Sequence, residues 1–419
     1  MHDKQGDREP SSPSPTSSET AEFDSSRPRT LAVCSFFPYP TTHGDAVRRA
    51  MMLEGLAEFT DLTVLLVRRP STTDDDIDQA RDRLAPARVE VFSPSIPPNT
   101  SPASRARRLG MSLVRGAPSG MFSEWSGPLE ARLEQLAPSA DVVVMIGEPS
   151  LTHSLPKSLR TPVIVDKSNV LTASGFDALR TYARLKPRMR TLMHLPMVFL
   201  FERRTVKSAE AVWVTSQEER ARLRKFHGQD ASILKSAAPA ASAVDWDGAG
   251  RTWSWMSTFA YEPNWDGLTR ILSALDADRP AGFKMNVIGA NASPEQIAHL
   301  RRYSFVNYLG FQPDLTAALQ GSVGAVVPVW SGAGVKLKTL TLMAMGMPVI
   351  ATPVALEGIP QDTAAAVAHT PKEFSRHIAN IKYGQLLEGR AAGLRYARED
   401  LSPEQFKRSL RDLLVAVVG

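Results

Sequence analysis

The chain alternates short apolar runs with segments of helical spacing, and this alternation constrains the fold more than any other feature. The runs are rich in β-branched residues and lack apolar–polar alternation, so they predict strands buried on both faces. Such strands separated by helices, for example the helix expected from Asp45 to Phe59, form parallel sheets covered on both sides. The first series of runs is LAVCSFF, LTVLLV, VEVF, DVVVMIG, PVIVDK and AVWVTS, and the second is TWSWMST, KMNVIGA, VNYLGF, GAVVPVW, MPVIATPV and AAAVAH.

A segment of small and polar residues over 237–250 separates the two series and predicts a linker. At about 150 residues per domain, a chain of 419 residues predicts two doubly wound, Rossmann-like α/β domains that face each other across a ligand cleft. We place the N-terminal, acceptor-side domain at 29–240 and the C-terminal domain at 250–385, followed by C-terminal helices over 386–419. Residues 1–28 are rich in Ser, Pro and acidic residues and predict a disordered tail.

Composition excludes several classes of protein. The single cysteine, Cys34, rules out an intrachain disulfide and argues against a zinc cluster, and we expect it to serve packing. The net charge of +5 admits an anionic ligand or a membrane surface. Because no nucleic-acid-binding module is present, we expect no nucleic-acid partner. No run reaches the ~18 apolar residues of a membrane span, and the first residues do not resemble a secretory signal, so we expect a cytoplasmic protein.

One loop between a strand and a helix has the character of an anion site. A buried strand is expected to end at Val329, and the loop over 331–334 leads into a helix that Gly346 can terminate. Glycines before a helix let the backbone approach a ligand, and the helix N-terminus favours phosphate. Lys336 and Lys338 in the first turn are unfavourable for helix stability, which suggests a diphosphate site. The alternative is a tight turn with two solvated lysines.

This segment, over 324–360, resembles the C-terminal signature of retaining glycosyltransferases of the GT-B fold, glycosyltransferase family 4. The closest subgroup reads P-x-x-x-G-x-G-x-(K/R)-x-K-x-x-E-A-M-A-x-G-x-P-V-(V/I)-A-T, followed by E-G-(L/I). The matching positions here are Pro328, Gly332, Gly334, Lys336, Lys338, Met343, Ala344, Gly346, Pro348, Val349, Ala351, Thr352, Glu357 and Gly358.

Other segments resemble further motifs of that family in the same order, and the resemblance covers the chain from about Leu31 to the C-terminus. The matching segments are Phe37 to Arg48, which includes Gly44, Asp141 to Pro149, Val165 to Asn169, Glu202-Arg203, Val214 to Ser216, and Tyr261 to Asp266.

The resemblance implies transfer of a sugar from a nucleotide-diphosphate sugar, of UDP or GDP type, to an acceptor hydroxyl with retained configuration. It implies no metal and no other cofactor, an acceptor that is a small molecule, a glycan or a lipid-linked molecule, and a role in glycan, glycolipid or glycosylated-metabolite biosynthesis. It also implies that the terminal helices cross back to the first domain. In this reaction the protein mainly stabilises the departing diphosphate.

Site residues are assigned from the resemblance together with the loop chemistry. The catalytic residues are Lys336, Lys338 and Glu148; the donor-binding residues are Gly332, Gly334, Val335, Thr341, Glu357 and Asn264; and the acceptor-binding residues are Gly44, Arg48, Asp166 and Asn169.

Structural alternatives exist for several of these residues. Glu148, Asp166 and Asn169 follow strands, where sites collect in open α/β sheets, but each can equally cap a helix. We expect Asn264 to cap the helix that follows Pro263 rather than contact the donor. We expect Arg48 to reach the cleft or an anionic acceptor. For Arg49, its neighbour, we expect a position in solvent.

The sequence departs from the family pattern at two places. Thr341 stands where the family has the second Glu of a Glu-x7-Glu pair, and Ala333 stands at the first. Gly147 stands where the family often has a His before the Glu, and His153 either substitutes for it or is a solvated loop residue. These departures suggest two alternatives: a catalytically silent GT-B protein that binds a ligand or partner, or an enzyme of the same fold with other chemistry on an activated sugar.

Two segments, over 105–115 and 184–207, combine apolar residues with flanking Arg and Lys. Basic amphipathic segments in the acceptor half suit an anionic bilayer and a lipid-linked acceptor, and hence a peripheral position at the inner face of the membrane. The alternative is that they are core helices with solvated basic ends.

Overall fold

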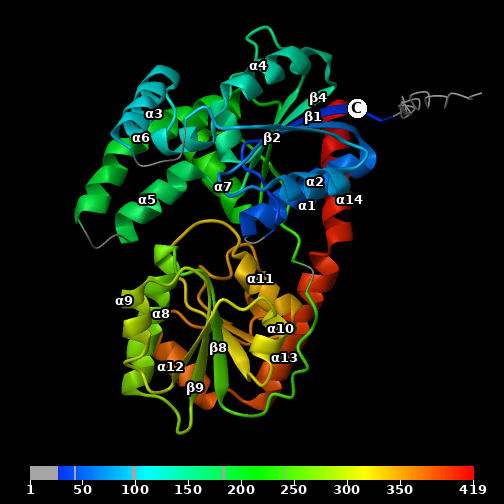
Figure 1. The fold of residues 1–419 in the computed structure, drawn as a ribbon. Helices are drawn as coiled ribbons and strands as arrows, with labels where there is room; N and C mark the ends of the chain where they lie inside the picture. Colours follow the sequence, from blue (N-terminus) through cyan, green and yellow to red (C-terminus); the bar gives the residue numbers. More distant parts are fainter. Residues whose placement is uncertain (1–26, 42–43, 97–100, 182–184, 240) are drawn as a thin grey trace, which may run out of the picture.

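The computed structural model of the protein describes residues 27–41, 44–96, 101–181, 185–239 and 241–419. Residues 1–26, most of the expected tail, lie outside the described residues, as does Arg184 at the start of the second basic segment. The chain forms two halves, each built on a parallel sheet with helices on both faces (Figure 1). The predicted fold class is therefore confirmed.

The N-terminal half contains a seven-stranded sheet in the order β3-β2-β1-β4-β5-β6-β7, and every pair of neighbours is parallel. The central strands are buried along their length, as the unbroken apolar runs predict. The strands are β1 (Arg29–Cys34), β2 (Asp61–Val67), β3 (Arg88–Phe92), β4 (Val142–Ile146), β5 (Val163–Lys167), β6 (Ala211–Val214) and β7 (Ser232–Ile233).

The C-terminal half contains a six-stranded parallel sheet in the order β10-β9-β8-β11-β12-β13. In both halves the strand order reverses beside the first strand, β1 or β8, and this switch point is where ligands bind in open parallel sheets. The strands are β8 (Thr252–Met256), β9 (Lys284–Ile288), β10 (Val306–Gly310), β11 (Gly324–Val327), β12 (Val349–Ala351) and β13 (Ala366–Val367).

Helices connect the strands and cover both sheets (Figure 1). In the N-terminal half they are α1 (Gly44–Phe59), α2 (Asp74–Leu84), α3 (Pro102–Arg115), α4 (Gly127–Leu136), α5 (Leu171–Thr181), α6 (Leu185–Lys207) and α7 (Gln217–His227), with short 3₁₀ helices η1 (Ser119–Glu124), η2 (Ala137–Ser139) and η3 (Glu148–Thr152). In the C-terminal half they are α8 (Glu262–Ala277), α9 (Pro294–Leu300), α10 (Leu315–Leu319), α11 (Leu337–Ala344), α12 (Pro371–Asn380) and α13 (Tyr383–Arg395), with the 3₁₀ helix η4 (Gln361–Thr363). The π-helical η5 (Tyr396–Asp400) then leads to α14 (Pro403–Val418).

Local chemistry explains where several of these helices begin and end. Ser216 caps α7 by accepting the backbone N–H of Glu219, and Gly228, with φ of 67°, ends that helix. Gly346 follows α11 with φ of 73°, as predicted for its terminator. The strand expected to reach Val329 ends two residues earlier, at Val327.

The chain crosses between the halves twice. Residues 234–251 lead from β7 to β8, and the chain returns between η5 and α14. The last helix lies against α1, where a Cβ on Gly55 would lie 2.8 Å from Leu410 Cδ2 and Lys407 Nζ lies 2.5 Å from Glu58 Oε2. The boundary that we placed between residues 385 and 386 falls inside α13, a helix of the C-terminal half.

Candidate active site

The loop between β11 and α11 carries two glycines with positive φ, Gly332 at 108° and Gly334 at 77°. A Cβ on Gly332 would lie 2.5 Å from the Tyr261 hydroxyl oxygen, and a Cβ on Gly334 would lie 2.1 Å from Asn169 Oδ1. Any other residue at either place would be strained and would collide with its neighbour. Because Asn169 follows β5, this loop lies directly against the N-terminal half.

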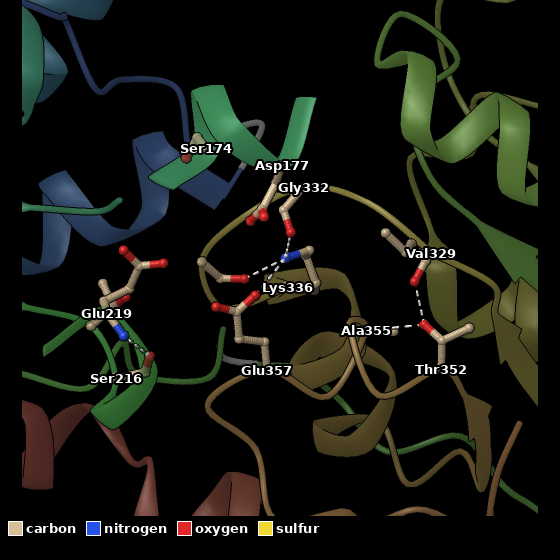
Figure 2. Close-up of polar contacts among 12 residues, drawn as sticks. Ser174, Asp177, Ser216, Glu219, Val329, Gly332, Lys336, Thr352, Ala355 and Glu357 are labelled. Carbon is tan, nitrogen blue, oxygen red and sulfur yellow. Dashed lines mark hydrogen bonds and ion pairs between the residues drawn. The ribbon is translucent and has the colours of Figure 1, made fainter. Parts of the chain in front are cut away.

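Lys336 occupies the N-cap position of α11, one residue before the helical turn in which we expected it, and its ammonium turns back over the loop (Figure 2). Nζ donates to the carbonyl oxygens of Gly332, at 3.2 Å, and Gly334, and it lies 3.7 Å from Glu357 Oε2. Burial lowers the pKa of Lys336 and raises that of Glu357, and the attraction between them opposes both shifts. The positive charge of Lys336 is therefore partly neutralised by one carboxylate, that of Glu357.

Lys338, in the first turn of α11, has a different environment. Its Nζ donates to Asn264 Oδ1 at 2.5 Å and to Ser257 Oγ at 3.3 Å. Burial, followed by repulsion from Lys336, lowers the pKa of Lys338 to about 7, and no carboxylate among the described residues contributes to that pKa. The charged form of a half-buried lysine that lacks a carboxylate partner is disfavoured in the free protein, and an anionic ligand would stabilise it.

Glu357 links the two halves of the molecule. Arg222, on α7, donates to the carboxylates of both Glu357 and Glu219, and it lies 4.0 Å from Asp177 on α5. Figure 2 shows Asp177 and Glu219, from the N-terminal half, around Lys336 and Glu357. A charged network therefore spans the boundary between the halves beside the glycine loop.

Three predicted residues approach this loop from the N-terminal half. A Cβ on Gly44 would lie 2.9 Å from Leu337 Cδ1, and Asn169 contacts Gly334 as described. Glu148, at the end of β4, accepts the backbone N–H of Asn169 at 3.1 Å. Burial raises the pKa of Glu148. The carboxyl ends of β4 and β5 and the start of α1 therefore meet the glycine loop and α11.

Arg48 and Asp166 lie in the core behind this edge. Arg48 Nη2 donates to Asp166 Oδ1 at 2.6 Å, and its Nη1 donates to Leu234 O and Ser236 Oγ, each at 3.0 Å. Their side chains are only 3% and 1% exposed. Arg48 therefore does not extend into open solvent, and a direct contact with a ligand requires this ion pair to break.

Arg49 is buried as well, and our expectation that it lies in solvent is wrong. It is 4% exposed, and its guanidinium stacks on the Phe36 ring with Cζ 4.7 Å from the ring centroid. Its Nε and Nη1 have no hydrogen-bond partner within the described part of the chain. A Cβ on Gly147, which has φ of 76°, would lie 2.8 Å from Arg49 Nη2. An arginine of α1 therefore occupies the space that a side chain at position 147 would need.

The predicted donor residues differ in how they are placed. Asn264 does not cap α8, because Tyr261 is the N-cap residue, and Asn264 Nδ2 instead donates to Thr258 O at 3.0 Å. Val335 packs against Gly358, where an added Cβ would lie 2.7 Å from Val335 Cγ2. Thr341 Oγ1 donates to Leu337 O at 2.9 Å, within its own helix.

His153 fits neither alternative given for it. It is 4% exposed, and its ring nitrogens bond Ser35 Oγ at 3.2 Å and the backbone N–H of Ser126 at 3.1 Å. Burial lowers the pKa of His153 to about 4, so the ring is neutral at neutral pH.

Several residues of this region were not predicted as site residues, among them Arg222, Ser257 and Arg49. Ser257 follows β8 directly. Its position at the carboxyl end of a strand could have identified it as a candidate site residue. Arg222 lies in a helix of mostly charged residues, QEERARLRKFH, and nothing in that run distinguishes it.

Two Rossmann-like halves that meet at the carboxyl ends of their strands, with a glycine loop and two lysines between them, define a protein of the GT-B fold. The sequence model of the family described as Glycosyl transferases group 1 matches residues 251–382, the strands and helices that carry this loop. A search of curated proteins gave no match.

Solved structures of the same fold cover nearly the whole chain. Sucrose-phosphate synthase from Thermosynechococcus elongatus superposes with a TM-score of 0.65 at 14% identity, covering 93% of this chain and 100% of that one. HepE of Anabaena, in complex with UDP-glucose, gives 0.63 at 12% identity, covering 93% and 100%. WaaG, a glycosyltransferase involved in lipopolysaccharide biosynthesis, gives 0.61 at 13% identity, covering 91% and 99%. At these identities the likeness shows the fold.

Proposed function

We propose that the protein is a retaining glycosyltransferase similar to family 4, which transfers a sugar from a nucleotide-diphosphate sugar to an acceptor hydroxyl. The observation that carries the proposal is Lys338, a half-buried lysine with no carboxylate partner among the described residues, beside Lys336 and the glycine loop at the carboxyl edge of the C-terminal sheet. The match of residues 251–382 to Glycosyl transferases group 1 supports it.

In this proposal the donor diphosphate lies between the glycine loop and the first turn of α11. The transition state develops negative charge on the departing diphosphate, and fixed positive charge in a desolvated site stabilises it. Lys338 supplies a charge that no carboxylate neutralises, and Lys336 adds a second when the phosphate replaces Glu357. Glu357 is then available to the donor sugar. The acceptor hydroxyl attacks the anomeric carbon on the face from which the diphosphate departs, and its proton passes to the departing phosphate oxygen. Configuration is thus retained without an enzymatic nucleophile.

The donor is of the UDP or GDP type, and the reaction needs no metal. HepE, solved with UDP-glucose, has the same fold, which favours UDP as the first nucleotide to test. Gly332, Gly334, Val335, Thr341 and Asn264 complete the donor site. We place Glu148 at the reaction centre because it accepts the backbone N–H of Asn169, whose side chain lies against Gly334.

The acceptor binds in the N-terminal half, at Gly44 and Asn169, with Arg48 and Asp166 as positioning residues behind them. We take 29–240 as the acceptor domain, 250–385 as the donor domain and 386–419 as the terminal helices, allowing for the end of α13. The acceptor is a small molecule, a glycan or a lipid-linked molecule in glycan, glycolipid or glycosylated-metabolite biosynthesis. A cytoplasmic protein, peripheral at the inner face of the membrane, fits this proposal.

Nucleotide binding tests the proposal most directly. We expect titration calorimetry to detect UDP or GDP binding, and incubation with a panel of nucleotide sugars to release the nucleotide. Lys338→Met should weaken nucleotide binding about 10- to 100-fold, the effect of one charge-assisted hydrogen bond. Lys284→Met, at an exposed lysine on β9, is the matched control and should bind normally. If the folded protein binds no nucleotide or nucleotide sugar, the proposal is wrong.

Thr341 supports a second candidate, a catalytically silent GT-B protein. Its hydroxyl is committed to the Leu337 carbonyl, and a hydroxyl lacks the charge and bidentate reach of a carboxylate. If the native protein binds no nucleotide sugar and Thr341→Glu does, the silent alternative is supported. Turnover by the native protein excludes it. Mass spectrometry of the products distinguishes transfer from other chemistry on an activated sugar.

A further inference from the structure

Two neighbouring helices at one side of the N-terminal half, α3 and α6, form an unusual surface (Figure 1). They contact each other through Ser112 Oγ and Met197 Sδ, at 3.2 Å, and through Arg204 Nη2 and Arg115 O, at 2.9 Å. We call their solvent-facing residues the α3/α6 face. It lies outside the candidate active site.

The α3/α6 face exposes large apolar side chains. Val114 is 84% exposed, Met193 77% and Leu113 70%. More than half of the large hydrophobic side chains exposed in the described part of the chain lie on these two helices: Leu109, Leu113, Val114, Met189, Leu192, Met193 and Leu200. On α6 they follow helical spacing and form one stripe, whereas a helix that packs in a soluble core turns such a stripe inward.

The same face is strongly basic. Helix α3 has four arginines and no acidic residue in its sequence PASRARRLGMSLVR. In the part of α6 whose side chains the structure describes, the one acid, Glu202, is fully buried and pairs with Lys167 at 3.0 Å. Arg105, Arg107 and Arg190 are exposed beside the apolar residues. A second copy of the chain would bring arginines against arginines, so the charge argues against self-association.

A cavity of about 950 Å³ lies where the two helices end, between them and strands β4 and β5. Its lining includes Val114 of the apolar surface, Arg160 and Arg204, as well as Glu210 and Arg115, whose guanidinium pairs with Glu130 at 2.6 Å. Arg160 and Arg204 are therefore the arginines available to a ligand. Guanidinium groups bind phosphate through paired N–H donors. Apolar side chains and phosphate-binding groups therefore lie side by side, which matches the boundary between acyl chains and headgroups of a bilayer.

Within the described part of the chain, no helix has the length and apolar character that crossing a bilayer requires. We propose that this face docks on the surface of a bilayer that contains anionic lipid. Its role, to hold the acceptor half against a membrane that presents a lipid-linked acceptor, rests on the proposed function, whereas the docking itself does not.

Co-sedimentation of the full chain with lipid vesicles tests the docking. We expect binding to vesicles of phosphatidylcholine with phosphatidylglycerol and little binding to phosphatidylcholine alone. Raised salt should weaken the binding, because exposed charges are screened. The double variant Leu113→Ser with Met193→Ser should weaken binding about tenfold or more, and Arg107→Glu with Arg190→Glu should act in the same direction.

Matched controls come from the C-terminal half. Phe311, 70% exposed like Leu113, is changed to Ser, and the exposed Arg302 to Glu, and both variants should bind vesicles as the native protein does. Equal binding to both vesicle types, no binding to either, or equal losses in the controls would each overturn the proposal. Nucleotide binding of the same preparations, measured without vesicles, tests the proposed function separately.

Discussion

The guanidinium of Arg49 fills the space beside Gly147, lying 2.8 Å from where a Cβ on that glycine would be. Gly147 ends β4 with φ of 76°, and Arg49 comes from the first helix, nearly a hundred residues earlier. In the family that the sequence resembles, a His often projects from this position. Here the polar group beside Glu148 is instead the Arg49 guanidinium from α1. Arg49 is buried in the space that a side chain at position 147 would occupy.

Gly147→Ala should therefore destabilise the protein by about 2–4 kcal/mol, since it adds the strain of a positive-φ extended backbone (φ 76°, ψ 158°) to a collision with a buried charge. Chemical denaturation measures the free energy of unfolding. Gly384→Ala is the control, because a Cβ there meets nothing within 4 Å. That helical change should be neutral or stabilising by up to about 1 kcal/mol. Equal stability of Gly147→Ala and the native protein would show that Arg49 does not occupy this space.

Nucleotide binding should depend on the protonation of Lys338. The pKa of Lys338 in the free protein is lowered to about 7, and a bound diphosphate favours the protonated form and raises that pKa. Binding therefore takes up a proton above pH 7, and affinity should fall by up to about tenfold per pH unit above that value.

Calorimetry in two buffers of different ionisation enthalpy counts the protons taken up. Lys338→Arg carries a permanent charge, so its binding should lose this pH dependence while keeping affinity at high pH. The same proton uptake in native and Lys338→Arg proteins would assign the titration to another group.

The ion pair between Arg222 and Glu357 should restrain the opening of the molecule between its halves. Arg222→Met removes a half-buried charged contact worth about 1–3 kcal/mol, so we expect a larger radius of gyration by small-angle X-ray scattering. Arg220→Met, on the same helix, breaks an ion pair with Asp230 inside the N-terminal half and serves as control. If both variants scatter alike, this contact does not set the separation of the halves.

Glu202 should determine much of the acid stability of the N-terminal half. Its carboxylate pairs with Lys167, bonds His227 Nε2 at 2.9 Å and accepts the backbone N–H of Thr172. Lys167 and these hydrogen bonds hold the pKa of Glu202 well below its usual range against the effect of burial. A carboxyl whose pKa is lower in the folded state adds stability above its unfolded pKa, and this stability is lost as the pH falls below about 4.3.

Glu202→Gln should consequently lower the free energy of unfolding at pH 7 by about 3–5 kcal/mol, because it leaves Lys167 buried without its partner. It should also flatten the dependence of stability on pH below that value. Glu262→Gln, at an exposed position at the start of α8, should change neither. A native-like acid profile in Glu202→Gln would contradict this account.

The sequence predicted the fold well because the relevant information is local. Strands such as VVVMI are buried on both faces, and that burial is visible as an unbroken apolar run. The one strand that the apolar runs did not predict among the described residues is β7. It is two residues long, and Ser232 and Ile233 form no apolar run. The glycine loop was found for a similar reason, because its glycines and lysines are contiguous.

These local patterns could not predict contacts between segments that are far apart in the sequence. Arg48 and Arg49 are adjacent charged residues, and nothing local shows that both are buried, one against Asp166 and the other between Phe36 and Gly147. Arg222 enters the site only because α7 faces Glu357 across the boundary between the halves. The residue pattern also gave no break at Arg395, so the limit of the second domain was placed inside a helix.

The two crossings of the chain run beside each other and are joined by a hydrogen bond from Ala238 N to Leu401 O of 2.9 Å. We expect the paired crossings to act as a hinge about which the two halves rotate relative to each other. In the proposed reaction, the geometry in which donor and acceptor meet then depends on this contact between the two crossings as well as on the residues of the site.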